Sequence, residues 1–189
     1  MDVTVLYCSR QGLDAYQDEG FGGIEVEWDI PLLDGYKSVF LKNWSRKPVV
    51  GGLTSLINPG IVSVLARERP DALIVHGYSH LTTLMAIAAA RLLMIPIFMR
   101  GDANPLDARY ANPHTPKNRL RQKNRELIFS FVSGYLAIGT RNRQFYLNHG
   151  VCPDRIFLAP FSVDNDYFRE HMLLAHEREG FLLGKRSPI

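Results

Sequence analysis

Basic and polar side chains recur directly after short apolar runs of the sequence, at points where buried strands are expected to end. His76 follows the run 72–75, Arg100 follows 96–99, and a Gly-Thr-Arg-Asn turn at 139–142 follows 135–138. In an open parallel sheet the carboxyl ends of the strands share one edge, and ligands bind in the crevice outside that edge. We therefore predict one binding cleft lined by Arg10, His76, Arg100, Asp102, Thr140, Arg141 and Asn142.

These residue types suit a ligand that carries negative charge or hydroxyl groups. The planar guanidinium of Arg100 fits phosphate or carboxylate, and a helix that opens after Gly139 offers backbone N–H groups to an anion. Each residue also has a structural interpretation. His76 can be a satisfied structural histidine, Arg100 can pair with Asp102, Asp102 can cap its loop, Thr140 can cap a helix, and Arg141 can be a solvated charge. The convergence of several strand ends, more than any one residue, favours the binding interpretation.

Helix and strand signals alternate along the chain. Strands are predicted at 2–7, 24–30, 72–75, 96–99, 135–138 and 155–159, and helices at 59–69, 80–93, 116–131, 140–149 and 169–179. Asn58, Ser79 and Thr140 are expected to cap three of these helices. Strand–helix–strand crossovers join parallel strands, so the predicted fold class is α/β, with a doubly wound, mostly parallel, Rossmann-like sheet and strand 2–7 at its centre. The first turn lacks the Gly-x-Gly-x-x-Gly pattern of a dinucleotide site.

An aromatic group between residues 28 and 44 has two interpretations. Trp28, Tyr36, Phe40 and Trp44 crowd a loop-rich region. They can form a satellite hydrophobic cluster under a long loop. They can also form an aromatic floor that suits a sugar, with Asp29, Asp34 and Asn43 nearby to bind its hydroxyl groups.

The helix predicted at 116–131 opens with an unusual run of cations. Lys117, Arg119, Arg121, Lys123 and Arg125 oppose the helix dipole in its first half. A solvated charged face explains such a run, but its position at this end of the helix favours an anionic partner. That partner is either the headgroup surface of a membrane or a phosphorylated acceptor. The buried stripe is expected to contain Leu120, Leu127, Ile128 and Phe131.

Bulk composition excludes several classes of protein. The 189 residues are 46% hydrophobic and 22% charged, as in an ordinary soluble globular protein, and the net charge of +3 is too small to indicate a nucleic-acid partner. The longest apolar stretch, 81–98, is interrupted by Thr82, Thr83, Arg91 and Pro96, so a membrane-spanning helix is not expected. Cys8 and Cys152 have no metal-like spacing and are expected to be reduced thiols. We expect a cytoplasmic protein, with peripheral attachment to the inner face of the membrane as an option.

The segment 135–168 resembles the end of the N-terminal domain of a glycosyltransferase family four enzyme. The resemblance rests on Tyr135-Leu136-Ala137-Ile138-Gly139-Thr140-x-Asn142, Tyr146, His149-Gly150-Val151, Arg155-Ile156, Pro160 and Val163-Asp164-Asn165-x-x-Phe168. The run 28–36 is also similar to a segment of some members. These are retaining enzymes of GT-B architecture, in which two Rossmann-like domains face each other across a cleft. The resemblance implies that residues 1–175 form the acceptor-side domain and that 176–189 are a C-terminal tail.

The resemblance also implies an activity. The chain would be half of an enzyme that moves a sugar from a nucleotide-sugar donor to a glycan or lipid-linked acceptor, with no cofactor or metal, and His76 would contact the reacting sugar. Two features depart from the family. Residues 8–23 replace the usual glycine pair and first helix, and no paired glutamates of a donor-binding domain follow. We therefore expect the chain to be inactive without a separate donor-binding domain. The alternatives are a non-catalytic Rossmann-like module that binds a sugar, an anion or a partner protein, and an unrelated nucleotide-binding α/β protein.

Overall fold

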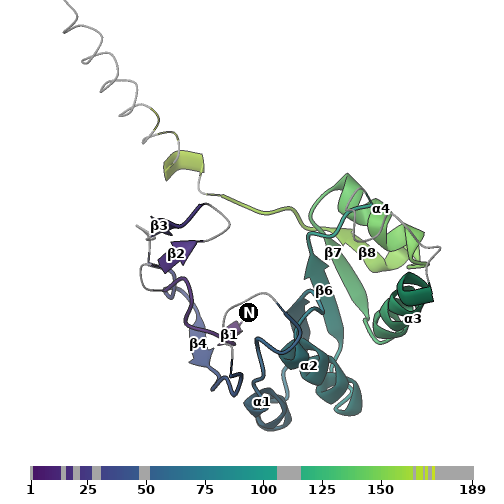
Figure 1. Cartoon of the computed structure of the whole chain (residues 1–189), viewed down its shortest axis with the longest axis horizontal. Coiled ribbons are helices and arrows are strands. Elements are labelled where there is room, and N and C mark those ends of the chain that lie inside the picture. Colours follow the sequence, from purple (N-terminus) through teal and green to yellow (C-terminus); the bar gives the residue numbers. More distant parts are fainter. Residues whose placement is uncertain are drawn as a thin grey trace, which may run out of the picture. The chain divides into compact units, whose positions relative to one another are not determined.

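Four short strands form the parallel sheet on which the fold is built (Figure 1). The structure, a computed structural model, describes residues 2–13, 16–18, 22–26, 31–46, 52–105, 116–163, 165–167, 169 and 172. The strands of this sheet, in spatial order, are β5 (Leu73–His76), β6 (Ile97–Gly101), β7 (Gly134–Ala137) and β8 (Ile156–Leu158). Each strand pairs in parallel with the next. The predicted α/β class with a parallel sheet is confirmed.

One helix precedes the first of these strands and three helices connect them, as the sequence predicts. They are α1 (Gly60–Glu68), α2 (Leu81–Leu92), α3 (Pro116–Ser130) and α4 (Thr140–Asn148), followed by a short 3-10 helix at Pro153–Arg155. Helix α2 contacts β5 and β6, α4 contacts β7 and β8, and α1 packs beside α2 (Figure 1). Helix α4 ends before Gly150, whose φ of +77° is the left-handed conformation expected for a glycine after a helix.

The hydrophobic core lies on one face of this sheet. Strand side chains that point to the core are almost fully buried, and they are Val75, Ile97, Met99, Tyr135 and Ala137. Because side chains alternate along a strand, the intervening residues belong to the opposite face. On that face, which we call the open face, Ile74 is 56% and Phe157 51% exposed, while Phe98 and Leu136 are half-buried. The described helices therefore bury one side of the sheet much more completely than the other.

The N-terminal strand is not the centre of this sheet. Strand β1 (Thr4–Tyr7) pairs in parallel with β4 (Lys37–Phe40) and forms a separate two-stranded sheet. The predicted central position was therefore wrong, because the partner of β1 is a strand that the sequence pattern did not reveal. The predicted strand at 24–30 is present as β3 (Ile24–Val26), paired antiparallel with β2 (Tyr16–Asp18), and residues 27–30 lie outside the described part of the chain.

A buried asparagine joins the two sheets. Asn58 is fully buried, and its Nδ2 donates to the carbonyl oxygens of Cys8 and Leu41, both at 3.0 Å. These two residues directly follow β1 and β4. Asn58 Oδ1 accepts from Thr82 Oγ1 at 2.8 Å, and the same hydroxyl accepts from the Asn58 backbone N–H at 2.9 Å. The network ties the carboxyl ends of β1 and β4 to the first turn of α2.

The predicted helix caps were wrong. Asn58 does not cap α1, because Pro59 occupies the N-cap position and the Asn58 side chain bonds elsewhere. His80 rather than Ser79 is the N-cap of α2, and Gly139 rather than Thr140 is the N-cap of α4. His80 forms no side-chain capping hydrogen bond, and Gly139 has no side chain that could form one. In each helix the N-cap residue has an extended backbone and lies one position away from the predicted one: after Ser79 in α2 and before Thr140 in α4.

Helix α3 buries a different face from the one predicted. Leu120 is 61%, Leu127 58% and Phe131 39% exposed, whereas Phe129 is 4% exposed. The Phe129 ring makes edge contacts with aromatic side chains of β7 and α4, among them Tyr135 and Phe145. The aromatic cluster around Phe129 fixes the rotation of the helix, so three of the four residues of the predicted apolar stripe lie on its outer side.

The second unit of the chain, Pro160–Ile189, is described only in part. Within it Phe161 and Val163 are exposed, and Arg169 forms an exposed ion pair with Asp166 at 2.9 Å. The predicted helix at 169–179 falls almost entirely outside the described residues, as do the tail 176–189 and most of the loop 102–115.

Replacement of Asn58 by alanine is expected to lower the free energy of unfolding by about 2–3 kcal/mol, because several buried polar groups lose their partners. Thr82→Val should cost less, since only the hydroxyl is removed. Urea denaturation measures both losses, and hydrogen exchange should show the amides of β1 and β4 opening first.

The matched control is Asn124→Ala, which removes an exposed amide from α3. Equal losses of stability for Asn58→Ala and Asn124→Ala would show that the buried network does not hold the two sheets together.

Candidate functional site

Three of the predicted strand ends meet at one edge of the parallel sheet. Strands β5, β6 and β7 are neighbours and run in the same direction, so His76, Arg100 and the turn at 139–142 lie along the same carboxyl edge. His76 and Arg100 are partners in the β5–β6 register and share the open face. The N–H of Gly77 donates to the Arg100 carbonyl oxygen at 2.7 Å and extends the ladder beyond His76. The edge brings a histidine and an arginine side by side.

The Arg100 side chain is held across the sheet. Its guanidinium donates to the carbonyl oxygen of Ala159 at 3.3 Å. Ala159 directly follows β8 and is itself fixed by a hydrogen bond from its N–H to the Ala137 carbonyl oxygen at 2.8 Å. Because the guanidinium is anchored at one end of its fork, less conformational entropy is lost when it binds an anion.

His76 lies at the surface next to this cation. Partial burial of the ring and the nearby positive charge of Arg100 lower the pKa of His76 below its ordinary value. The ring is therefore neutral at physiological pH, and a neutral imidazole can both donate and accept a hydrogen bond. The arrangement suits contact with sugar hydroxyl groups beside a phosphate that pairs with arginine.

Asn142 has a positioning role that the sequence prediction did not include. The side chain is 3% exposed; its Nδ2 donates to the Ala103 carbonyl oxygen at 2.7 Å, and its Oδ1 accepts from the Ile138 N–H at 3.2 Å. The amide therefore links the chain after β6 to the chain after β7. The predicted contact between Asn142 and a ligand stays a prediction.

The remaining predicted residues are exposed at or near strand ends. Thr140 and Arg141 occupy the first turn of α4, and Asp102 directly follows β6. Arg10 belongs to the other sheet, where its guanidinium lies 5.0 Å from the centre of the Phe40 ring. The structure thus brings His76 and Arg100 together, places Asp102 and the turn at 139–142 on the same edge, and pairs Arg10 with an aromatic ring.

Sequence reasoning missed the buried network of Asn58 and Thr82 that joins the β1–β4 pair to α2. Asn58 was interpreted as a helix cap because it precedes a proline, and Thr82 only as an interruption of an apolar stretch. The one signal available in the sequence was the hydroxyl of Thr82 in the first turn of an otherwise apolar helix, because a buried hydroxyl needs a hydrogen-bond partner. The partner, 24 positions earlier in the sequence, could not be read from local pattern.

Other kinds of site are not found in the part of the chain that the structure describes. No three His, Cys, Asp or Glu side chains gather there as metal ligands would. None of the described helices is long and apolar enough to cross a bilayer. Cys8 and Cys152 are free thiols, the first half-buried and the second exposed.

Arg100→Gln is expected to raise the pKa of His76 toward its ordinary value, because a like charge is removed while the ring stays where it is. An NMR titration of the His76 ring protons measures the shift. A histidine with a lowered pKa binds its proton more readily in the unfolded chain. The free energy of unfolding should therefore decrease as the pH falls below about 6.5, and decrease less steeply in the variant.

Arg143→Gln, which removes an exposed cation from α4, is the charge-matched control and should leave this titration unchanged. A His76 titration that is the same in Arg100→Gln and in the unaltered protein would contradict the proximity of the two side chains.

Comparison with known proteins finds solved structures that match part of this chain at low sequence identity. No protein-family model matches the chain, and no curated protein does. One solved structure with a similar fold is a Listeria monocytogenes protein assigned as a UDP-N-acetylglucosamine 2-epimerase, with 23% identity, a TM-score of 0.39, and coverage of 52% of this chain and 25% of that chain. Another is the UDP-GlcNAc 2-epimerase of Methanocaldococcus jannaschii, with 20% identity, a TM-score of 0.39, and coverage of 65% and 30%. The chain spans between a quarter and a third of the length of these proteins. Neither is described as a glycosyltransferase, so the predicted family stays a prediction.

Proposed function

We propose that the chain is the acceptor-side half of an enzyme that transfers a sugar from a nucleotide-sugar donor. The observation that carries this proposal is the pairing of His76 with Arg100 at the carboxyl edge of a parallel sheet. In this reaction the sugar and its diphosphate are adjacent parts of one substrate. A neutral imidazole next to an anchored guanidinium matches that combination, because the imidazole binds hydroxyl groups and the guanidinium binds phosphate.

Catalysis in the complete enzyme would be positional and electrostatic. The guanidinium of Arg100 would stabilise the negative charge that develops on the leaving phosphate. His76 would orient the transferred sugar, and Thr140 or Arg141, in the first turn of α4, would orient an acceptor or bind its phosphate. The sequence resemblance to family four supports the retaining outcome, and a second polypeptide or domain would bind the nucleotide.

The acceptor is proposed to be a glycan or a lipid-linked sugar at an anionic membrane. Arg119, Arg121 and Lys123 are exposed on α3, and exposed Leu120 and Leu127 lie in the same stretch. Helical geometry of 100° per residue places Leu120 and Leu127 on one stripe, with Lys123 on one flank and Arg121 on the other. An apolar stripe between cations is the pattern of a helix that lies in the plane of a membrane surface.

Arg125 does not belong to this surface. Its guanidinium lies 5.7 Å from the centre of the Phe145 ring and is hydrogen-bonded to His149 Nε2. One cation of the predicted basic run is therefore directed inward, toward α4. The membrane-facing set is limited to residues on the outer side of α3.

Nucleotide-sugar binding tests the proposed edge. UDP-glucose, UDP-N-acetylglucosamine and GDP-mannose are titrated separately into labelled protein, and NMR shifts of the His76 ring and of the amides at 100–101 and 139–141 are followed. At least one of them should move these signals. Arg100→Gln should weaken that binding about tenfold or more, because a charged hydrogen bond to phosphate is lost.

Arg143→Gln serves as the control and should bind as the unaltered protein does. Equal affinities for Arg100→Gln and Arg143→Gln, or no response to any of the three compounds at millimolar concentration, would overturn the proposal.

Vesicle binding tests the outer face of α3. The double variant Arg119→Gln with Arg121→Gln should bind vesicles of phosphatidylglycerol at least fivefold more weakly, since each basic residue near an anionic surface contributes about 1 kcal/mol. Arg91→Gln with Arg143→Gln removes the same charge from α2 and α4 and should bind nearly as the unaltered protein does. Leu127→Ser should also weaken binding. Equal vesicle affinities of the two double variants would show that binding depends on the net charge of the protein and not on the position of the cations on α3.

A further inference from the structure

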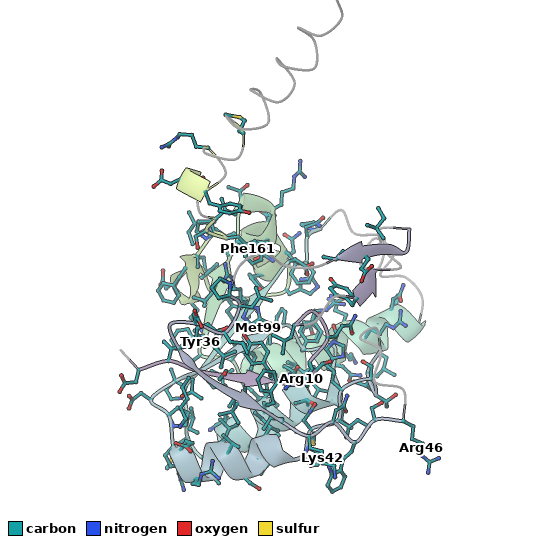
Figure 2. All side chains as sticks on the ribbon, turned by 90° about the vertical axis from the view of Figure 1, so that its left-hand side faces the viewer. Arg10, Tyr36, Lys42, Arg46, Met99 and Phe161 are labelled. Carbon is teal, nitrogen blue, oxygen red and sulfur yellow. The ribbon has the colours of Figure 1, made fainter. Side chains whose placement is uncertain are left out.

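The outer face of the β1–β4 sheet carries a cavity that the proposed function does not use. Leu6 and Leu41 pack against the hydrophobic core. In the β1–β4 register Leu6 lies opposite Val39, and Tyr7 lies opposite Phe40. Because neighbouring side chains point to opposite faces of a strand, Tyr7 and Phe40 belong to the face turned away from the core. Their rings stack with centres 4.9 Å apart. Figure 2 views this side of the molecule, with Tyr36 and Arg10 labelled.

Three tyrosines, an amide and two leucines surround this cavity. Its volume is about 490 Å³, within the range of about 300–1,000 Å³ that is usual for small-molecule sites. The side chains that define its chemistry are Tyr7, Tyr16, Tyr36, Gln11, Leu13 and Leu32. Gly12, with a φ of +87°, forms the turn that brings Gln11 and Leu13 to the cavity.

A relay of hydrogen bonds fixes the two phenols at the cavity wall. The Tyr36 hydroxyl donates to the Leu32 carbonyl oxygen, so in the hydrogen bond between the two hydroxyls Tyr7 is the donor. Each phenol has a single donor hydrogen and two acceptor lone pairs. Both hydrogens are used within the relay, and the oxygen atoms keep acceptor capacity toward the cavity. The hydrogen bond to Tyr36, together with burial, also raises the pKa of Tyr7 above its ordinary value.

The described residues that line the cavity carry no formal charge. Their polar groups are phenols and one amide, and the nearby Arg10 guanidinium is placed over the Phe40 ring. A phosphate or carboxylate would find no partner of opposite charge in this lining. A pyranose ring fits it better, because its C–H face packs on aromatic and leucine side chains while its hydroxyl groups donate to phenol oxygens and bond to the amide of Gln11.

We propose that this cavity is a binding site for an uncharged saccharide unit of a glycan, separate from the carboxyl edge of the parallel sheet. None of its lining residues belongs to the edge formed by His76, Arg100 and the turn at 139–142. The site does not require the chain to transfer a sugar. It would hold a glycan whether the protein is half of an enzyme or a binding module.

Neutral trisaccharides are the probes for this site. Maltotriose, cellotriose, mannotriose and chitotriose are added to protein labelled with carbon-13 on its tyrosine rings, and saturation transfer and tyrosine shifts are recorded. At least one trisaccharide should bind and move the Tyr7 and Tyr36 signals. Tyr36→Phe and Gln11→Ala should each weaken that binding about fivefold or more, as expected for the loss of a hydrogen bond.

Two further variants separate binding from folding. Leu13→Trp fills the cavity without removing a hydroxyl and should abolish binding. Tyr135→Phe removes a buried phenol that also donates to a backbone carbonyl, that of Phe129 at 2.9 Å, but lies in the core and should leave binding unchanged. Weakening by Tyr135→Phe equal to that by Tyr36→Phe would overturn the proposal.

The edge and the cavity can fail independently. Arg100→Gln should leave trisaccharide affinity unchanged, and Tyr36→Phe should leave nucleotide-sugar affinity unchanged. No saturation transfer to any trisaccharide at 10 mM, on the order of the weakest specific affinities, would overturn the saccharide site without affecting the proposal for the edge. Binding of uridine or adenosine in place of the trisaccharides, lost in Leu13→Trp, would also overturn it and assign the cavity to a nucleobase.

Discussion

The desolvated amide of Asn58 constrains the fold because each of its polar atoms has to find a partner inside the protein. Strand β1 pairs only with β4 among the described strands, so no backbone ladder connects this pair to the larger sheet. Apolar packing of Leu6 and Leu41 against the core stabilises the contact but does not fix one orientation of the strand pair, because the hydrophobic effect is non-directional. Asn58 fixes that orientation, because it donates hydrogen bonds to two strand-end carbonyl oxygens and accepts one from Thr82. A half-satisfied network would cost more than an apolar contact, so the two sheets have one preferred arrangement.

A second buried asparagine, Asn142, also joins two segments that follow strands. Asn142 links the Ala103 carbonyl to the Ile138 N–H, as Asn58 links the ends of β1 and β4. In both cases an amide side chain replaces backbone pairing that stops where strands end. Asn58 and Asn142 therefore both act as structural supports through their buried amides, whatever further contact Asn142 makes with a ligand.

The elements that the sequence predicted well are those whose signal is local. Strands β5 to β8 are short apolar runs bounded by glycine or proline, and the helices between them follow from length and periodicity. The prediction failed where a partner far along the chain decides the structure. Strand β1 pairs with β4, whose sequence carries no clear strand signal, and α3 is rotated by the aromatic cluster at Phe129 rather than by its own leucines. At the site, parallel topology was enough to predict that His76, Arg100 and the turn at 139–142 share one edge. The position of Arg10 and the role of Asn58 depend on tertiary contacts, which a local sequence pattern does not show.

The cavity beside β1 and β4 follows from the kind of connection that joins these two strands. Helices of crossover connections normally cover the faces of a parallel sheet. Between β1 and β4 the described residues form a hairpin, β2–β3, and turns instead. Turns cover a flat strand pair less completely than a helix with large side chains, and the uncovered face would expose the Tyr7 and Phe40 rings. Tyr36 and the turn at Gly12 border that face without filling it, which leaves a concave surface lined by phenol groups and leucine side chains. In the two proposals, the edge with His76 and Arg100 binds the phosphate-bearing end of a glycoconjugate, and the cavity beside Tyr7 and Tyr36 binds an uncharged saccharide.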